Sequence, residues 1–213
     1  MNQMTKSDLI GLTDVAAKIP QFMTKVPHLI TGLKQAYLRT PNTPAGLGLA
    51  FEKAVHRNPH GCALVFEDQQ YSYLQLNAWA NQIAHYYLSI GARKGDVIAV
   101  MLENRPELIA SVIGLAKIGV IAALVNTAQV AKVLAHSINL VKPIAVIVGE
   151  ECRQAVADIR QELELAENRL YWFADQNTRT DTGTAPEGFQ NLAQCIASFP
   201  SFNPATTQSV QGK

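Results

Sequence analysis

The amino-acid sequence predicts an α/β fold in which a layered, mostly parallel β-sheet is flanked by helices, with a helical extension at the amino terminus. Three observations carry this prediction. Short apolar runs alternate with segments of helical periodicity through most of the chain. Residues 94–127 contain a complete strand-helix-strand unit. Hydrophobic residues make up 48% of the 213 residues and charged residues 16%, which is enough apolar content for a core.

The central unit is predicted as two parallel strands, residues 97–102 and 120–125, joined by a helix over residues 108–118. Apolar residues cover nearly the whole circumference of that helix, which indicates deep burial. The crossover is long enough to return the chain parallel to the first strand. Residues 108–125 also reach the lower end of the length that spans a membrane, roughly 17–25 residues. Lys117 and the β-branched second half favour a buried helix followed by a strand.

Both ends of the central helix carry boundary signals. Asn104 is the expected N-cap, with Glu107 three residues later and Pro106 in the first turn, where its missing N–H costs nothing. Lys117 suits the negative end of the helix, and Gly119 is the expected stop. These signals bound the helix between Asn104 and Gly119.

Upstream of the central unit we expect a short helix, a β-hairpin and a long helix. The hairpin is predicted from residues 63–66 and 70–73, which flank a polar turn. Ser72 with Gln75 is predicted to form a capping box at the start of the long helix, and Gly91 to end it.

Downstream, strands and helices continue to alternate. We predict a helix over residues 128–140, a strand at 144–148, a more polar and exposed helix over 150–167, and a strand at 170–174. A last short helix is expected near residues 189–196. This order of elements is typical of an α/β layered sheet.

Three regions follow from this pattern. Residues 1–44 form an amphipathic helical extension and linker, residues 45–200 an α/β subdomain, and residues 201–213 a tail. Phe202 and Val210 are the only core residues expected in that tail.

Residues 1–40 carry apolar residues at helical spacing on both sides of Pro20. The same segment has five basic and two acidic residues, a local net charge of +3. Two amphipathic helices with a basic side are typical of segments that lie on a membrane surface, so peripheral contact with the inner face of a membrane is one interpretation. The other is that the apolar faces pack on the protein itself or on another subunit, and a homodimer therefore stays open.

Composition also bears on partners and location. The net charge is +1, which gives no electrostatic argument for nucleic acid binding. Cys62, Cys152 and Cys195 are widely spaced and form no Cys-x-x-Cys pair, which favours reduced thiols in a cytosolic protein. Asp8 and Gly11 interrupt the first apolar residues, so we expect no signal peptide and a cytoplasmic location.

Short motifs between residues 63 and 151 carry a resemblance. The first group reads ALVFED at 63–68, YSY at 71–73, NQIA at 81–84 and GARKGDVIA at 91–99, and it resembles the start of an acyl-adenylate-forming enzyme. The second group reads MLENRPE at 101–107, GLAKIG at 114–119, AALVNT at 122–127, His136-Ser137 and IVGE at 147–150. Within that superfamily it resembles the fatty acid transport protein and very-long-chain acyl-CoA synthetase family. The resemblance covers about half of the chain.

The resemblance implies a parent enzyme that uses ATP, magnesium and coenzyme A to convert a long-chain fatty acid into an acyl-adenylate and then a thioester. No stretch of this sequence matches the Ser/Thr/Gly-rich phosphate loop that such enzymes carry just after the matching region. The chain is therefore expected to be an amino-terminal part that is inactive alone, with the remainder of the parent polypeptide as its partner. The alternative is a free-standing module that binds an acyl chain or a partner subunit without catalysis.

No catalytic, cofactor-binding or metal-ligating residue is assigned. His56 and His60 have the spacing of metal ligands but lie in a predicted surface turn. Because ligands of open α/β sheets bind beyond the carboxyl ends of the strands, Asn126, Thr127 and His136 are candidates for the border of an acyl or coenzyme groove. The competing interpretation is a capping Asn/Thr pair and a structural histidine.

Overall fold

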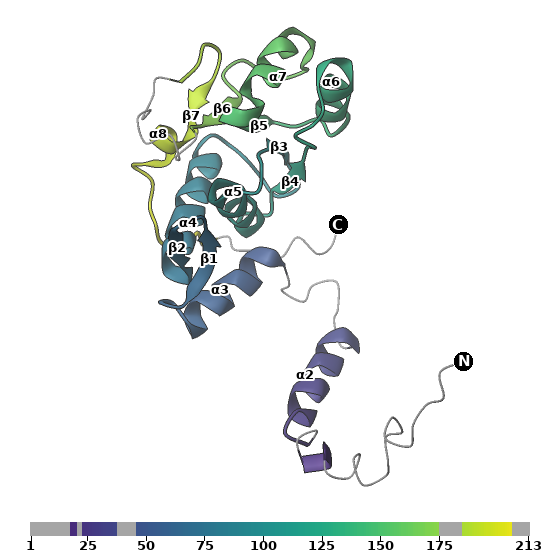
Figure 1. Ribbon diagram of the computed structural model, residues 1–213, viewed down its shortest axis with the longest axis vertical. Coiled ribbons are helices and arrows are strands. Elements are labelled where there is room, and N and C mark those ends of the chain that lie inside the picture. Colours follow the sequence, from purple (N-terminus) through teal and green to yellow (C-terminus); the bar gives the residue numbers. More distant parts are fainter. Residues whose placement is uncertain (1–17, 21–22, 38–45, 175–184, 206–213) are drawn as a thin grey trace, which may run out of the picture. The chain divides into compact units, whose positions relative to one another are not determined.

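The structure, a computed structural model, describes residues 18–20, 23–37, 46–174 and 185–205 (Figure 1). It divides into two compact units, Met1–Thr43 and Pro44–Lys213. The first unit contains α2 (Val26–Tyr37), which falls within the second amphipathic stretch of the extension. The linker expected near residues 40–44 and most of the apolar run before Pro20 lie outside the described residues.

The second unit is built on a five-stranded sheet in the order β4-β3-β5-β6-β7, with every pair parallel. Its strands are β3 (Val97–Met101), β4 (Ile121–Leu124), β5 (Ala145–Gly149), β6 (Leu170–Phe173) and the two-residue β7 (Gln190–Asn191). The predicted parallel pairing of the central unit is confirmed, with Val97 opposite Ile121. The short β7 was not expected from the sequence.

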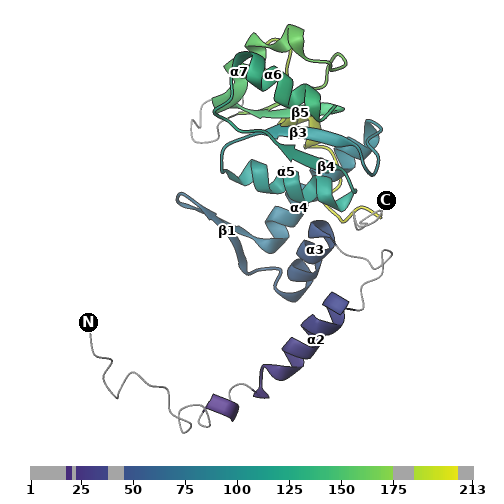
Figure 2. The same cartoon turned by 90° about the vertical axis from the view of Figure 1, so that its right-hand side faces the viewer.

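Side chains alternate between the two faces of the sheet and enter two separate core clusters. In β3, Ile98 and Val100 pack with the helices of one face, whereas Ala99 and Met101 pack with those of the other. The first face is covered by α4 (Tyr73–Ser89) and α5 (Pro106–Lys117), and the second by α6 (Ala131–Leu140) and α7 (Arg153–Asp158) (Figure 2). The predicted α/β layered fold is confirmed, and α5 is deeply buried as expected.

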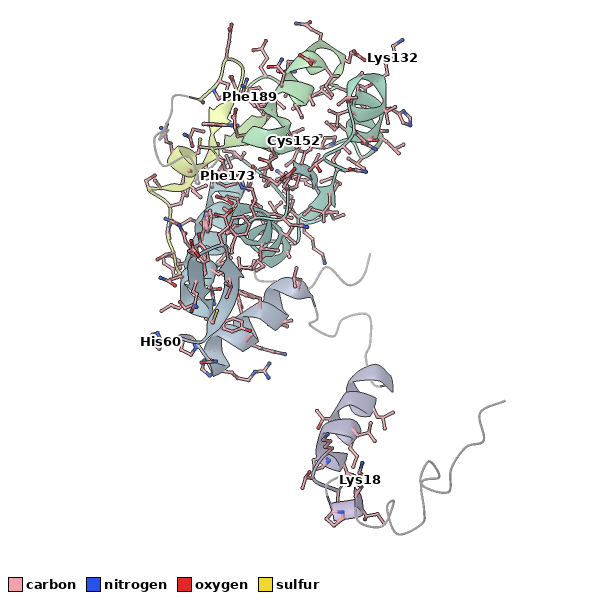
Figure 3. The ribbon with its side chains drawn as sticks, viewed as in Figure 1. Lys18, His60, Lys132, Cys152, Phe173 and Phe189 are labelled. Carbon is pink, nitrogen blue, oxygen red and sulfur yellow. The ribbon has the colours of Figure 1, made fainter. Side chains whose placement is uncertain are left out.

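Figure 3 labels two residues of the core cluster on the second face of the sheet, Cys152 and Phe189. Cys152 and Phe189 lie in the layer between the sheet and its helices, and both side chains are buried. Lys132 points outward from α6. All three cysteines of the chain are free thiols.

The upstream elements form as predicted. β1 (Cys62–Phe66) and β2 (Gln69–Ser72) make an antiparallel hairpin. The Ser72 hydroxyl accepts a hydrogen bond from the Gln75 amide, and the Gln75 side chain accepts one from the Ser72 amide, which completes the expected capping box of α4. This local exchange satisfies two of the N–H groups that a helix start leaves without partners.

Two glycines allow three helices to pack closely. A Cβ atom at Gly114 in α5 would lie 2.5 Å from the Ala80 carbonyl oxygen of α4. A Cβ atom at Gly48 in α3 (Leu47–Arg57) would lie 2.8 Å from the Cα atom of Lys117. Both approaches are closer than any side chain permits, so glycine at these positions lets α3 and α4 pack directly on α5.

Two helix starts differ from the sequence prediction. α5 begins at Pro106 with Arg105, not Asn104, as its N-cap, and no side chain caps it. The Arg105 side chain binds Glu107 and the segments that follow β5 and β6. The helix therefore begins one residue later than predicted. α6 begins at Ala131 rather than residue 128, because Asn126 uses its side chain to accept the Ala128 amide in a tight turn.

The predicted exposed helix over residues 150–167 is wrong in form, and its exposure is confirmed only for the polar residues. The segment consists of the 3₁₀ turn Glu150–Cys152, α7 and the 3₁₀ turn Arg160–Glu162. Its apolar residues Val156, Ile159 and Leu163 are buried against the sheet. Because most residues of the segment are polar, the sequence did not reveal the short apolar stripe that runs along the two turns and α7.

The tail prediction is also corrected. Phe202 is 68% exposed and its ring makes a T-shaped contact with that of His85, whereas Pro204 is buried. The Phe202 carbonyl lies 3.0 Å from Nε2 of His85, so this histidine of α4 holds the segment after α8 by a hydrogen bond. Val210 lies outside the described residues.

Candidate functional site

The carboxyl ends of the parallel strands meet at one edge of the sheet, which is where open α/β sheets bind their ligands. Two cavities lie there, one of about 500 Å³ beside β3 and β4 and one of about 240 Å³ beside the hairpin and the end of β3. Glu103 and Asn104, which follow β3, line both of them. These cavities form the candidate site.

The larger cavity has an apolar floor and a polar rim. Val100, Leu102 and Leu108 contribute to the floor, and Asn126 and Thr127 lie on the rim directly after β4. The structure thus brings two of the three sequence candidates to one cavity. The third candidate, His136, is exposed on α6 and is not among the residues that line it.

The smaller cavity is organised by Arg105, a residue that the sequence analysis did not select. Arg105 is 8% exposed; its Nε donates to Glu107 at 2.8 Å and its Nη1 to Glu151 at 3.0 Å. Nη2 donates to the carbonyl of Ala174, which follows β6. Glu151 also accepts the Glu103 amide at 2.7 Å. Arg105 therefore ties together the chain segments that leave β3, β5 and β6.

The charge of this cavity is negative. Glu67, Glu103, Glu107 and Glu151 line it, and Arg105 is the one basic residue among the described residues that line it. Tyr71 belongs to the same wall, and burial followed by the charge of Glu107 raises its pKa. Carboxylates repel phosphates, so these residues do not fit the triphosphate of ATP.

No residue of the described ranges is assigned to magnesium, ATP or coenzyme A. Within those ranges, no group of three His, Cys, Asp or Glu side chains is placed to hold a metal ion. His56 and His60 are exposed at and beyond the end of α3, and His60 lies at the outer surface of this unit (Figure 3).

The other end of α5 holds a second buried cation. Lys117 is fully buried, and its ammonium donates to Asn77 at 2.6 Å, Asn81 at 2.7 Å, Asn203 at 2.9 Å and Glu52 at 3.1 Å. Burial lowers the pKa of Lys117, and the hydrogen bond and charge of Glu52 oppose that shift. The four oxygens come from α3, α4 and the segment after α8 (Leu192–Ile196).

From the sequence, Lys117 was predicted only as a charge at the end of a helix, and this network was not predicted. One signal was present: Asn77 and Asn81 are four residues apart, so both lie on one face of the long helix, among its apolar positions. For Arg105 the signal was its position directly after a buried strand, between Glu103 and Glu107.

Comparison with known proteins gives the family. The model of the AMP-binding enzyme family matches residues 51–205. The medium/long-chain-fatty-acid–CoA ligase FadD6 of Mycobacterium tuberculosis is 31% identical over 204 residues, which is 96% of this chain and 32% of the relative. The long-chain fatty acid transport protein 1 of Rattus norvegicus is 36% identical over 115 residues, which is 53% of this chain and 18% of the relative.

Solved structures share the fold. The anthranilate CoA ligase AuaEII in complex with anthranoyl-AMP matches with a TM-score of 0.67 at 20% identity, over 78% of this chain and 30% of that chain. A Mycobacterium tuberculosis fatty acyl CoA synthetase matches with a TM-score of 0.61 at 22% identity, over 76% of this chain and 30% of that chain. At these identities the likeness supports the architecture alone.

The chain spans about a third of the length of FadD6 and corresponds to an amino-terminal portion of the AMP-binding domain. The family match covers most of the chain, and the parallel sheet agrees with the matching structures. The chain therefore belongs to the family of AMP-binding enzymes.

Proposed function

We propose that this chain is the amino-terminal part of a long- or very-long-chain fatty acid–CoA ligase. In the whole enzyme, ATP and a fatty acid give an acyl-adenylate, and coenzyme A then takes the acyl group as a thioester. The observation that carries the proposal is the 31% identity to FadD6 over 96% of the chain. The motifs of residues 63–151 support the same activity.

The chain is inactive alone under this proposal. Its sequence holds no Ser/Thr/Gly-rich phosphate loop, and its smaller cavity carries four carboxylates. Acyl-adenylate formation needs a cradle for phosphates. The rest of the polypeptide supplies that cradle together with the sites for magnesium and coenzyme A.

Pyrophosphate release tests the proposal in two arms. The isolated chain, given ATP, magnesium and palmitate, is expected to release none above a heat-killed control, and release above that control would contradict its inactivity. In the second arm, residues 46–205 replace the matching segment of FadD6. Palmitate-dependent release by this chimera supports the proposal when FadD6 without the segment is inactive. A soluble but inactive chimera opposes it.

Within that enzyme we assign the larger cavity to the acyl or coenzyme groove. Asn126 and Thr127 lie on its rim, and His136 is kept as a more distant candidate. Thr127→Val in the active chimera is expected to raise the KM for palmitate or coenzyme A while kcat changes little. His136→Ala serves as the comparison, because its side chain does not line the cavity.

A second candidate function is acyl-chain binding without catalysis. The buried apolar residues that line the larger cavity, Val100, Leu102 and Leu108, favour it. Micromolar binding of palmitate by the isolated chain, lost in Leu108→Asp, would support this module. Absence of binding leaves the groove dependent on the rest of the enzyme.

We also propose peripheral membrane contact through residues 1–40, at the inner face of a membrane. Leu29 is 55% exposed, and Ile30 and Leu33 are each 48% exposed along α2. Lys18, which Figure 3 labels, and Lys25 belong to the same segment of the sequence. Apolar burial and attraction of lysines to acidic headgroups, on the order of 1 kcal/mol per lysine, act together in such contacts. No helix in the described residues is long and apolar enough to cross a membrane.

Vesicle flotation tests the membrane contact. The full chain is expected to float with phosphatidylserine vesicles at low salt and to be released at high salt. A version that starts at Pro41 is expected not to float with the vesicles at either salt concentration. Equal flotation of both versions, or binding indifferent to salt, would contradict the role of the extension.

A further inference from the structure

The outer edge of the sheet is formed by β4, which pairs only with β3 among the strands that the structure describes. The amides of Ile121 and Val125 donate inward, to Asp96 and Val100. Because backbone groups alternate along a strand, the N–H and C=O groups of Ala122 and Leu124 point outward. They form a row of donors and acceptors on which a further strand could pair.

This edge is apolar and unprotected. Ile121 is 44% exposed and Leu124 is 64% exposed, whereas the residues of β5 and β6 are all buried. Parallel strands are normally covered on both faces. The sequence of β4, Ile-Ala-Ala-Leu, contains none of the charges or prolines that keep exposed edges from pairing. The larger cavity continues from this edge, since Leu124 and Val125 line it.

We propose that the outer edge of β4 docks an added strand, an extended apolar segment from the part of the enzyme that the relatives carry beyond their match to this chain. The inference rests on the proposed function, because it requires such a part. FadD6 aligns with 96% of this chain, but that alignment occupies only 32% of FadD6. Two thirds of the relative's length is therefore present to cover surface that this chain exposes. The added strand also forms one wall of the larger cavity.

Hydrogen exchange tests the proposal directly. In the isolated chain, the amides of Ala122 and Leu124 are expected to exchange rapidly. In the FadD6 chimera that carries residues 46–205, they are expected to exchange at least about tenfold more slowly. Unchanged exchange in a folded chimera overturns the proposal. So does an isolated chain that dimerises with both amides protected, because a second copy is then the occupant.

A charge at the edge gives a second readout in the same chimera. Leu124→Lys is expected to speed the exchange of the Ala122 amide by about tenfold, toward its rate in the isolated chain, since lysine blocks edge pairing. Val65→Lys, at a site 59% exposed on β1, is the matched control and should leave that rate unchanged. If both substitutions change the exchange rate equally, the β4 edge is not the docking site and the proposal fails.

The two proposals can fail separately. Pyrophosphate release by the chimera reports on the proposed function, and amide protection in β4 reports on strand addition. Protection without release supports the docking and opposes the enzymatic role. Pyrophosphate release without amide protection in β4 supports the enzymatic role and opposes the docking of an added strand.

Discussion

The two ends of α5 each hold a buried basic residue, and they hold it in different ways. At the carboxyl end, Lys117 is surrounded by three amide oxygens and the carboxylate of Glu52, and it lines neither cavity described above. At the amino end, Arg105 binds the carboxylates of Glu107 and Glu151 and lies in the wall of a cavity.

The difference shows how surroundings separate a structural cation from one at a candidate site. An ammonium closed off from water must find its hydrogen bonds within the protein, and neutral amides supply them without adding charge. Lys117 therefore fixes α3, α4 and the Asn203 segment around α5. Arg105 borders open volume, so water or a ligand can exchange with its partners.

The largest effect is expected from Lys117→Ala, because it removes the ammonium that donates to the side-chain oxygens of the buried Asn77 and Asn81 and breaks the ion pair with Glu52. Removing one partner of a buried pair costs roughly 3–5 kcal/mol. Urea unfolding of the isolated chain measures the loss. Lys132→Ala on α6 is the control and should stay within about 0.5 kcal/mol, as at most exposed sites. A loss below about 1 kcal/mol for Lys117→Ala would show that water reaches the ammonium.

The apolar middle of α5 supplies a reference without charge. Ile113 is 4% exposed, and Ile113→Ala is expected to cost roughly 2–5 kcal/mol of unfolding free energy. Ile109→Ala on the same helix, where the side chain is 38% exposed, should cost clearly less. Equal losses in the same urea titration would mean that the two faces of α5 are buried alike.

Arg105→Ala is expected to cost less than Lys117→Ala, roughly 1.5–3 kcal/mol, the range for hydrogen bonds to charged groups. Water in the adjacent cavity of about 240 Å³ can solvate Glu107 and Glu151 once the guanidinium is gone. Urea unfolding again gives the number. A cost as large as that of Lys117→Ala would break the distinction between the two ends.

The smallest effect is a pH dependence that only one end should show. Burial lowers the pKa of Lys117, so between that lowered pKa and 10.5 the unfolded chain binds the proton that the folded chain has released. Stability from this group therefore rises with pH across that window. The stability difference between wild type and Lys117→Ala should widen there, whereas the difference for Arg105→Ala lacks this contribution because arginine itself remains charged. A constant difference for Lys117→Ala would contradict the lowered pKa. Tyr86 and Tyr87, whose pKa values burial raises, act equally in all three proteins and cancel.

The sequence by itself determined the features that arise from neighbouring residues. The period of apolar residues located β3, α5, β5 and β6, because burial on a sheet or helix imposes that period. The capping box of Ser72 and Gln75 was predicted because both of its hydrogen bonds span three residues. The motifs within residues 63–151 indicated the family for the same reason, since each is a contiguous stretch.

The tertiary structure alone decided the features that depend on residues far apart in the chain. The partners of Lys117 are 65, 40, 36 and 86 positions away, so no local pattern identifies them together. Arg105 likewise reaches Glu151, 46 positions along the chain, and this contact shifts the start of α5 past Asn104. Buried charges are satisfied by whichever oxygens the packing of helices and strands brings near, and that packing is settled only when the whole sheet has formed.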